Sequence, residues 1–437
     1  MTRLVILGGG VAGLSAWRRA LALGCDVALV ERCLRTGGLT RSIRVGGFVF
    51  DYTGHFLHLA RTPHPGHLGA ARGSWRKVAR RAGCLVAGRV IPAPFQYHLG
   101  ALPEPARSAC VDGVQDLLAR GAPVVPEPGE DLLSFFVRAF GAGVTDWFLR
   151  PYNEKLLATD LRSLNAARLN RFFPAPDPAA VRAGLVSGPG AAQGTGATYN
   201  ATFWYPEDDG IGQLVDQLDP GLPHVPAEVT AVDLQRCVVL AGTRELPWDR
   251  LISTIPLPEL LRACGGPWRG PADALTASGV VAFQLGVSGS PAPLLGDRHW
   301  LYVPDPDLAF FRVGCYSNVS ACLAPRGCHS LYVEVGFSGA PPAPGPLADR
   351  VLTELVRAGL LADPGKVEVL LQHVIQPAYV RFDAGWDATA PAVLDRLAAL
   401  GVHGAGRWGR WDYLGMEDVI LEASSLVERV IGDPEGA

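Results

Sequence analysis

The feature that most constrains this chain is a glycine pattern close to its N-terminus. Gly8, Gly10 and Gly13 have the G-x-G-x-x-G spacing, between an apolar stretch at 4–7 and a predicted helix at 11–23. Gly8 permits a tight turn, Gly10 lets backbone N–H groups approach a pyrophosphate, and Gly13 lets the helix pack closely on the strand. The helix N-terminus adds unpaired N–H donors and the positive end of the helix dipole. The pattern therefore predicts a strand–turn–helix unit that binds the phosphates of a dinucleotide.

The second strand of this unit ends in an acidic residue. An apolar stretch at 26–30 leads to Glu31, which follows the last glycine by 18 residues. This spacing is close to that of an acid that binds a ribose. The carboxylate of Glu31 can accept hydrogen bonds from ribose hydroxyls, and it would repel a 2′-phosphate. These residues predict a Rossmann-like dinucleotide site that does not take NADP.

Composition and charge exclude several classes of function. The net charge is −3 and the 39 Lys and Arg residues form no basic block, so no nucleic-acid partner is expected. No apolar run reaches the roughly 18 residues that a membrane-spanning helix needs. The nine cysteines form no C-x-x-C pair and have no metal-ligand spacing. We therefore expect no metal, and reduced thiols in a cytoplasmic protein. A secreted protein is disfavoured because the basic pair Arg18-Arg19 follows the first apolar stretch instead of preceding it.

The rest of the chain predicts a mixture of helices and strands. Apolar residues recur at three- and four-residue steps at 114–118 and 132–140, within a segment (96–183) that is mainly helical in pattern. Strand-like stretches cluster between 280 and 336 and predict an antiparallel sheet. A glycine-rich, uncharged stretch at 184–198 predicts a mobile loop, which is either a functional lid or an inert insertion. The proline-rich stretch at 340–346 predicts a linker.

The stretch after Glu31 indicates which dinucleotide, NAD or FAD, the site binds. Gly37, Gly38 and Arg41 follow the acid, where an NAD enzyme would more usually begin another crossover helix. This pattern resembles the two-dinucleotide-binding-domain flavoproteins, the superfamily of amine oxidases, protoporphyrinogen oxidases and UDP-galactopyranose mutases. The resemblance implies FAD as the cofactor, with the glycine pair beside the flavin ring and ribityl chain.

By the same resemblance, two later segments complete the FAD site. The backbone of Val229 would meet the adenine, and a glycine turn with Gly406 and Arg407 would hold the ribityl–phosphate end. A helix is predicted to follow from about Met416. His55 lies in a Gly-His loop that would also contact the cofactor. Three separated segments would therefore build one cofactor site.

The predicted fold class is α/β. A Rossmann-like FAD-binding domain carries an inserted helical region and an antiparallel-sheet substrate domain. The cofactor-binding parts are predicted at 1–95, 205–260 and 381–437, the mainly helical substrate and lid region at 96–204, and the sheet domain at 261–380.

Several motifs are similar, more specifically, to the UDP-galactopyranose mutases. The loop GHFLHL carries His58, and AFFRVGCYSN carries Arg312, where the mutases have an arginine facing flavin and substrate diphosphate. GRWGRWDYLGMED matches the C-terminal mutase signature, with Tyr413 on the tyrosine that touches the diphosphate. Arg171 corresponds to an arginine of the mobile mutase segment, but the second arginine position falls near Ala175.

The resemblance implies an isomerase that acts on a nucleotide-linked sugar. In the mutases, N5 of reduced flavin displaces the diphosphate from the anomeric carbon, the sugar ring opens and recloses, and there is no net redox change. Arg312 would bind the diphosphate, Tyr413 would donate its hydroxyl, Arg171 would act from the mobile segment, and His58 would lie against the flavin and favour its reduced form. An external reductant, for which NAD(P)H is one candidate, would bind transiently, because no second nicotinamide fingerprint is evident.

Two other functions stay open at this stage. The stretch NATFWYPEDDGIG at 200–212 departs from the mutase pattern, although Trp204 and Tyr205 within it could stack on a substrate ring. This departure, together with the incomplete set of arginines, favours an FAD-dependent oxidase or desaturase of the amine-oxidase type in a biosynthetic pathway. A flavin-binding protein without catalysis is the third possibility.

Overall fold

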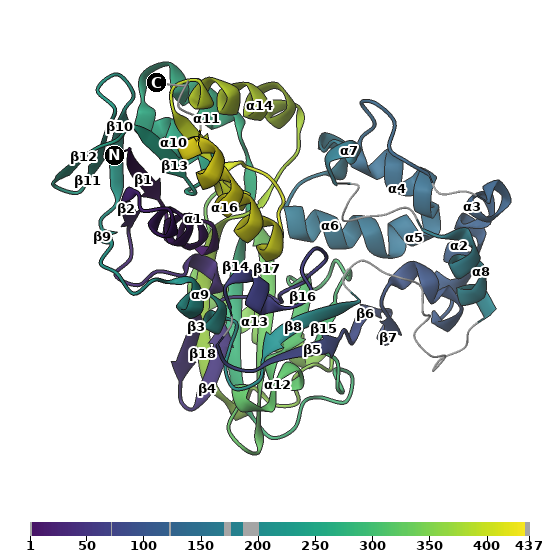
Figure 1. Ribbon diagram of the computed structural model, residues 1–437. Coiled ribbons are helices and arrows are strands. Elements are labelled where there is room, and N and C mark those ends of the chain that lie inside the picture. The colour runs from purple at the N-terminus through teal and green to yellow at the C-terminus, as the bar shows by residue number, and fades with distance from the viewer. Residues whose placement is uncertain (1, 71, 122–123, 170–175, 187–200, 433–437) are drawn as a thin grey trace.

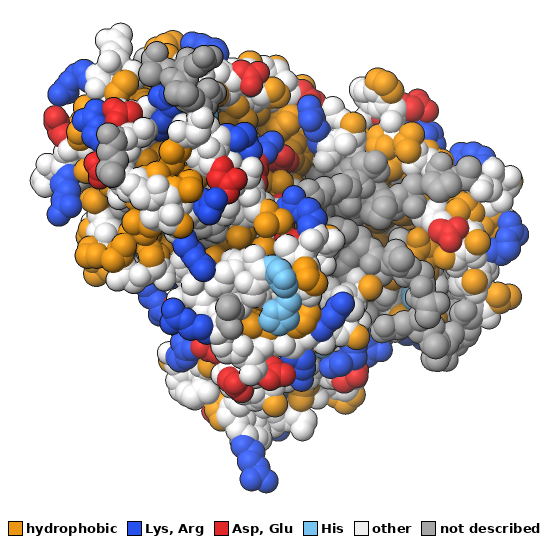
Figure 2. Space-filling view, in the orientation of Figure 1, with side chains coloured by type: hydrophobic (Ala, Val, Ile, Leu, Met, Phe, Trp, Pro, Cys, Tyr) orange, Lys and Arg blue, Asp and Glu red, His pale blue; other side chains and the backbone are white. Residues whose placement is uncertain are grey.

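The computed structural model describes residues 2–70, 72–121, 124–169, 176–186 and 201–432. Figure 1 shows a parallel sheet with its helices in the upper part of the main body, a larger mixed sheet below it, and a helical lobe to one side. The predicted α/β fold class is confirmed. On the face shown in Figure 2, Lys and Arg side chains are interspersed with Asp and Glu, in keeping with the small net charge.

The parallel sheet is the Rossmann-like part of the fold. Its order is β19–β13–β1–β2–β9, and each neighbouring pair is parallel. Its strands are β1 (Arg3–Leu7), β2 (Asp26–Glu31), β9 (Val225–Pro226), β13 (Arg250–Ser253) and β19 (Val402–Gly404). In the centre, Leu7 lies beside Val30 on one side and Ser253 on the other. Residues 4–7 are all buried, which is typical of a strand covered on both faces of a parallel sheet.

Helices from both ends of the chain cover this sheet. The predicted first and last helices are confirmed as α1 (Val11–Ala22) and α16 (Met416–Gly432), and the two pack against each other. The other helices of this part are α10 (Leu257–Cys264), α11 (Arg269–Ala274), α14 (Ala384–Ala398) and α15 (Gly406–Gly409). A small antiparallel sheet flanks them, formed by β10 (Val229–Asp233), β11 (Val238–Ala241) and β12 (Arg244–Pro247).

The mixed sheet has the order β18–β14–β17–β16–β15–β6–β7. Its strands are β6 (Ala82–Val86), β7 (Arg89–Pro92), β14 (Ala277–Ser288), β15 (Trp300–Tyr302), β16 (Arg312–Cys315), β17 (Cys328–Phe337) and β18 (Val367–Val380). The strands predicted between 280 and 336 are confirmed as antiparallel neighbours. The sequence did not predict that β6 and β7 would extend this sheet, with β6 parallel to β15.

The helical lobe comes from the middle of the chain. Its helices are α2 (Ala106–Gly113), α3 (Gln115–Arg120), α4 (Leu132–Phe140), α5 (Ala142–Val144), α6 (Arg150–Leu157), α7 (Ala166–Leu169) and α8 (Pro178–Val186). The helix predicted at 132–140 is confirmed, and Asp131 caps it by accepting a hydrogen bond from the Ser134 N–H at 2.9 Å.

Two predicted loop boundaries were wrong. Gly184 belongs to α8, because a Cβ at this position would lie 2.2 Å from the Tyr97 carbonyl oxygen, so the glycine allows close packing. Residues 187–198 of the predicted mobile loop lie outside the described residues. The proline-rich stretch at 340–346 is not wholly a linker, because its last residues begin α13 (Pro344–Arg357), where proline suits the first helical turn.

A buried carboxylate joins the smaller elements between the two sheets. These elements are β3 (Ser42–Val45), β4 (Phe48–Asp51), β5 (Trp75–Ala79), β8 (Thr202–Pro206), α9 (Gly212–Leu218) and α12 (Tyr316–Val319). Asp51 accepts hydrogen bonds from the Ser42 hydroxyl at 2.6 Å, the Tyr205 hydroxyl at 2.6 Å and the Ile211 N–H at 3.0 Å. Tyr205 is therefore a core residue, and the expectation that it stacks on a substrate was wrong.

The acid–base behaviour of Asp51 gives a prediction for stability. Burial raises the pKa of this carboxyl from 3.8 to about 6, although its hydrogen bonds act in the opposite direction. The folded protein therefore keeps a proton that the unfolded chain has lost, so the free energy of unfolding should fall as the pH rises from about 4 to 6, by about 3 kcal/mol for this group. Asp51→Asn cannot titrate. Denaturant melts of both proteins across this pH range should show that the free energy of unfolding falls more steeply with pH in the parent than in Asp51→Asn. An equal dependence on pH in the two proteins would contradict the raised pKa of Asp51.

Candidate active site

One large cavity lies where the parallel sheet, the mixed sheet and the helical lobe meet. Its volume is about 1300 Å³, and residues from all three regions line it. The glycine turn after β1 lies at one end and Arg312 and Tyr413 lie along the same cavity. A cofactor and a small-molecule substrate could therefore share it.

The glycine turn is built on a close approach of two backbone segments. Gly8 has φ +94°, which side chains rarely adopt, and a Cβ at Gly13 would lie 1.7 Å from the Gly8 carbonyl oxygen. Gly10 lies against Gly38, where an added Cβ would be 3.1 Å from the Gly10 Cα. Gly8, Gly13 and Gly38 therefore leave no room for a side chain, and the N-terminus of α1 opens directly into the cavity.

Glu31 is oriented by backbone groups. One carboxylate oxygen accepts a hydrogen bond from the Gly9 N–H at 2.7 Å, and the other accepts one from the Cys33 N–H at 2.9 Å. Each oxygen has a further lone pair, so ribose hydroxyls can still donate to it. The carboxylate lines the cavity together with Val229, as a ribose–adenine site requires.

The second glycine pair also belongs to the cavity wall. Gly37 and Gly38 have φ +110° and +55°, and both line the cavity. Arg41 donates from Nε to the Gly38 carbonyl at 2.9 Å, and its guanidinium lies 5.0 Å from the centre of the Tyr52 ring. Arg41 therefore stiffens the turn from the side.

The C-terminal glycine turn packs onto the first helix. Gly406 has φ +69°, and a Cβ there would lie 2.6 Å from the Ala12 Cβ. The next residue, Arg407, donates to the Ala378 carbonyl at 2.9 Å, and its guanidinium lies 4.1 Å from the centre of the Tyr413 ring. The Nε of Arg407 is buried with no protein partner among the described residues. An acceptor from a bound ligand would satisfy this donor.

A row of side chains crosses the mixed sheet under the other end of the cavity. Cys84, Tyr302, Arg312 and Glu334 are register partners on the adjacent strands β6, β15, β16 and β17, and all four line the cavity. Neighbours in register point to the same face of a sheet. The row thus places Arg312 on the cavity floor.

Arg312 is already paired with a carboxylate. Its Nε and one terminal nitrogen donate to the two oxygens of Glu334, the latter at 2.8 Å, and the two side chains are only 16% and 2% exposed. Burial alone would lower the pKa of Arg312, but Glu334 outweighs it and the pKa is raised. No sequence motif identified Glu334 as a site residue. Its signal was a lone charge inside the apolar strand LYVEVGF.

Both histidines of the GHFLHL loop line the cavity in their neutral form. Burial lowers the pKa of His55 to about 4, with further lowering from Arg407 and Arg312. Burial also lowers the pKa of His58 to about 4, and its Nδ1 lies 3.0 Å from the Thr202 carbonyl. His55 therefore faces the two arginines, whereas His58 faces β8.

The described site residues predicted from the sequence converge on this cavity, with two exceptions that act beside it. Gly13 and Gly406 do not line it but allow the backbone approaches described above. Arg171 lies outside the described residues. The sequence did not identify an aromatic wall in which Phe148 stacks between Phe95 and Tyr152, with ring centres 4.8 and 5.5 Å away.

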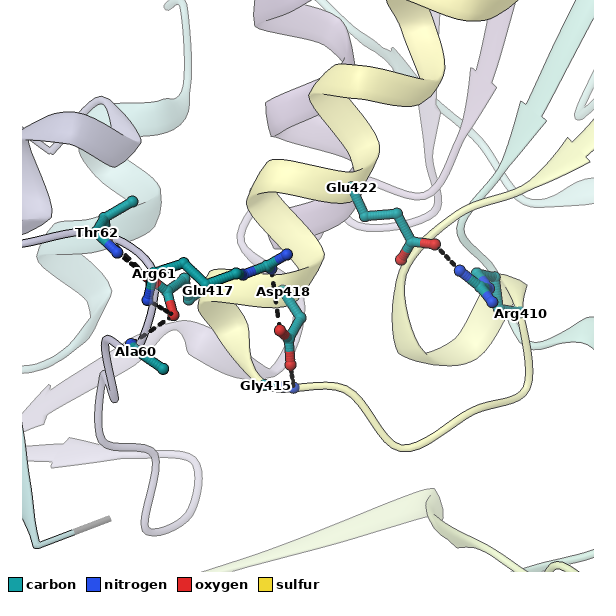
Figure 3. A network of polar contacts seen from close by, with 8 residues as sticks. All are labelled: Ala60, Arg61, Thr62, Arg410, Gly415, Glu417, Asp418 and Glu422. Atoms are coloured by element: carbon teal, nitrogen blue, oxygen red, sulfur yellow. Dashed lines mark hydrogen bonds and ion pairs between the residues drawn. The ribbon is translucent and has the colours of Figure 1, made fainter. Parts of the chain in front are cut away.

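A buried carboxylate ties the stretch after the histidine loop to α16. Figure 3 shows Glu417 accepting hydrogen bonds from the N–H groups of Ala60, Arg61 and Thr62 and from the Thr62 hydroxyl. Burial raises the pKa of Glu417, but these hydrogen bonds outweigh it and the pKa is lowered. Next to it, Asp418 forms an exposed ion pair with Arg61 at 3.0 Å. Glu417 therefore fixes how the loop and the helix enclose the cavity.

Comparisons with known proteins agree with this geometry. The family model described as an NAD(P)-binding Rossmann-like domain matches residues 6–67. Over its whole length the chain is similar to a crystal structure of reduced UDP-galactopyranose mutase, with 27% identity, a TM-score of 0.89 and 97% of that chain covered.

Two more distant structures share the fold over 99% of both chains. One is a protein named as a protoporphyrinogen oxidase from Exiguobacterium, with 18% identity and a TM-score of 0.74. The other is cyclohexylamine oxidase from Brevibacterium oxydans, with 16% identity and a TM-score of 0.67. The chain has the fold of the flavin-dependent enzymes. The resemblance to the amine oxidase and mutase superfamily is thus confirmed, and this flavoenzyme fold implies a flavin cofactor and a small-molecule substrate.

The residues present fit a flavin dinucleotide. The glycine turn, the oriented Glu31 and the orphaned donor of Arg407 lie along one continuous cavity. Across the described ranges, His, Cys, Asp and Glu form no group suited to a metal ion. The same ranges contain no helix with the length and apolar character that crossing a bilayer requires.

Glu31 provides a test of the dinucleotide site. In Glu31→Gln, an amide NH₂ would face the N–H of either Gly9 or Cys33, and one charged acceptor for ribose would be lost. We expect flavin affinity to fall about 10- to 100-fold, as measured by flavin fluorescence released on dilution. Asp26→Asn, at the exposed start of the same strand, is the matched control and should leave affinity unchanged. Equal flavin retention in all three proteins would rule out the role of Glu31.

Glu417 and Asp418 form a second matched pair. Glu417→Gln leaves buried N–H donors without a charged acceptor and should lower the free energy of unfolding by about 2 kcal/mol. Asp418→Asn removes an exposed pair and should cost about 1 kcal/mol or less. Chemical denaturation of the flavin-loaded proteins measures both changes. A larger loss of stability in Asp418→Asn than in Glu417→Gln would contradict the role given to Glu417.

Proposed function

We propose that this chain is an FAD-dependent isomerase that interconverts pyranose and furanose rings of a nucleotide-linked sugar, using the reduced flavin. The observation that carries the proposal is the placement of Arg312, Arg407 and Tyr413 on the same cavity as the dinucleotide turn. The similarity to reduced UDP-galactopyranose mutase over the whole chain supports it.

The residues on the cavity floor suit a substrate that carries a diphosphate. A guanidinium has five N–H donors, and the pair with Glu334 uses two of those on Arg312. Glu334 therefore holds the guanidinium plane in a fixed orientation while other donors remain for phosphate oxygens. Tyr413 adds a hydroxyl near Arg407. A leaving diphosphate held in this way stays close to the sugar for recapture.

The histidines complete the role of the chain in this proposal. Because His55 and His58 are neutral at pH 7, they can pack against a flat ring without adding a positive charge beside Arg312 and Arg407. Reduced FAD, when bound, supplies an electron-rich N5 as the nucleophile. NAD(P)H or another external reductant would keep it reduced, binding transiently. Arg171 remains a proposed ligand of the diphosphate.

A second candidate is an oxidase or desaturase of the amine-oxidase type. Two observations favour it, namely that Arg312 is largely neutralised by Glu334 and that Phe95, Phe148 and Tyr152 form an aromatic cavity wall. Such a wall suits an apolar substrate. This activity would consume oxygen with each turnover, whereas the isomerase would not.

Ring interconversion is the direct test. The dithionite-reduced protein, incubated with a panel of UDP- and TDP-linked pyranoses and furanoses, should convert at least one pair, and the oxidised protein should not. Arg312→Gln should lower the rate about 10²- to 10³-fold, whereas Arg236→Gln, which removes an exposed ion pair with Glu245 on the flanking sheet, should have no effect. Product analysis by chromatography, with oxygen uptake recorded in parallel, separates the two candidates. No conversion across the panel would refute the proposal.

A further inference from the structure

The sequence motifs supply too few arginines to bind both sides of a substrate diphosphate. The second arginine position of the mutase pattern falls near Ala175, so Arg312 would need another partner for a diphosphate. The described arginines that line the cavity are Arg32, Arg41, Arg80, Arg262, Arg312 and Arg407. Three of these belong to the dinucleotide end. Arg41 donates to the Gly38 carbonyl, and the charges of Arg32 and Arg262 both oppose the rise that burial gives to the pKa of Glu259. Of the other three arginines, Arg80 is the one that no sequence motif singled out.

The backbone of Arg80 is held firmly. It follows β5 directly, and β5 is paired along its length with β8. The Arg80 N–H continues this ladder by donating to the Ala201 carbonyl at 3.0 Å. The side chain is half-buried and lines the cavity. The position of the Arg80 backbone is therefore fixed by strand pairing.

The row across the mixed sheet locates Arg80 relative to Arg312. Cys84 and Arg312 lie on either side of Tyr302 in adjacent strands, so their backbones are about 10 Å apart. The charge of Arg80 acts on Cys84 and on His58. Burial raises the pKa of Cys84 and Arg80 opposes that rise, whereas burial lowers the pKa of His58 and Arg80 adds to that lowering. Arg312 on β16 and Arg80 at the end of β5 thus both line the cavity beside this row.

We propose that Arg80 is the second guanidinium that binds the substrate diphosphate, opposite Arg312. The inference rests on the proposed function, since it assumes a substrate that carries a diphosphate. Arg80 binds phosphate oxygens from the end of β5, while Arg312 binds them from β16. It is a binding residue that acts from a fixed strand end, in place of a second arginine on the segment near Ala175.

Binding of product fragments tests this without relying on turnover. The oxidised, flavin-loaded protein is titrated with UDP, TDP, uridine and inorganic pyrophosphate by isothermal calorimetry. In Arg80→Gln, the dissociation constants of UDP, TDP or pyrophosphate should rise about 10- to 100-fold, while that of uridine should stay within about twofold. Arg80→Lys keeps the charge but loses the two-point contact, so its dissociation constants should lie between those of the parent and those of Arg80→Gln. Lys77→Gln, at an exposed position of the strand that precedes Arg80, is the matched control and should behave as the parent.

The outcomes separate this inference from the proposed function. The role of Arg80 would be overturned if Arg80→Gln bound UDP and pyrophosphate as the parent does. It would also be overturned if the affinity for uridine fell equally, or if the parent protein bound no diphosphate. Parent protein that binds UDP through Arg80 but interconverts no sugar would refute the isomerase and leave the diphosphate site standing. Flavin content and melting temperature of each variant establish that it is folded, and Arg80→Lys gives the result if Arg80→Gln does not fold.

Discussion

The structure depends on the close approach of α1 to the turn that precedes it. With 1.7 Å between a hypothetical Gly13 Cβ and the Gly8 carbonyl oxygen, no side chain fits, and the helix N-terminus is held at the mouth of the cavity. The same helix receives Gly406 against Ala12 from the far end of the chain, and α16 packs along it. The cofactor half of the cavity is therefore made mainly by backbone contacts, which explains why so many of its positions are glycine.

The other half of the cavity is made by side chains whose charges are balanced. The buried pair of Arg312 and Glu334 is nearly neutral as a unit, and burial keeps His55 and His58 uncharged. A buried arginine without a partner would be costly, so Glu334 makes the position of Arg312 possible. The balance also limits how much positive charge Arg312 alone offers to a ligand. This is the physical reason why a further cation such as Arg80 matters to the proposed reaction.

Much of the site could be read from the sequence, because its signals are local. The turn at Gly8–Gly13 and the acid Glu31 follow from spacing along one strand–helix–strand unit, and Arg312 and Tyr413 follow from motifs. Arg80 and the wall around Phe148 could not be found in this way, and the lone charge of Glu334 in its apolar strand did not say which residue it would face. Glu334 faces Arg312 because β16 and β17 pair, and Arg80 lies just before β6, which joined the sheet through a parallel pairing that no local pattern announces. The aromatic wall comes from the helical lobe and reaches the cavity only through its packing against the sheets.

The sequence by itself determined that this chain contains a dinucleotide-binding α/β unit, since short-range spacing and glycine stereochemistry suffice for that conclusion. Only the tertiary structure decided which side chains share the cavity with it. Pairings between residues hundreds of positions apart, such as β1 with β13 and β13 with β19, bring three distant segments into one sheet. The same long-range packing made Tyr205 a core residue bonded to Asp51 and made Arg312 half of a buried pair.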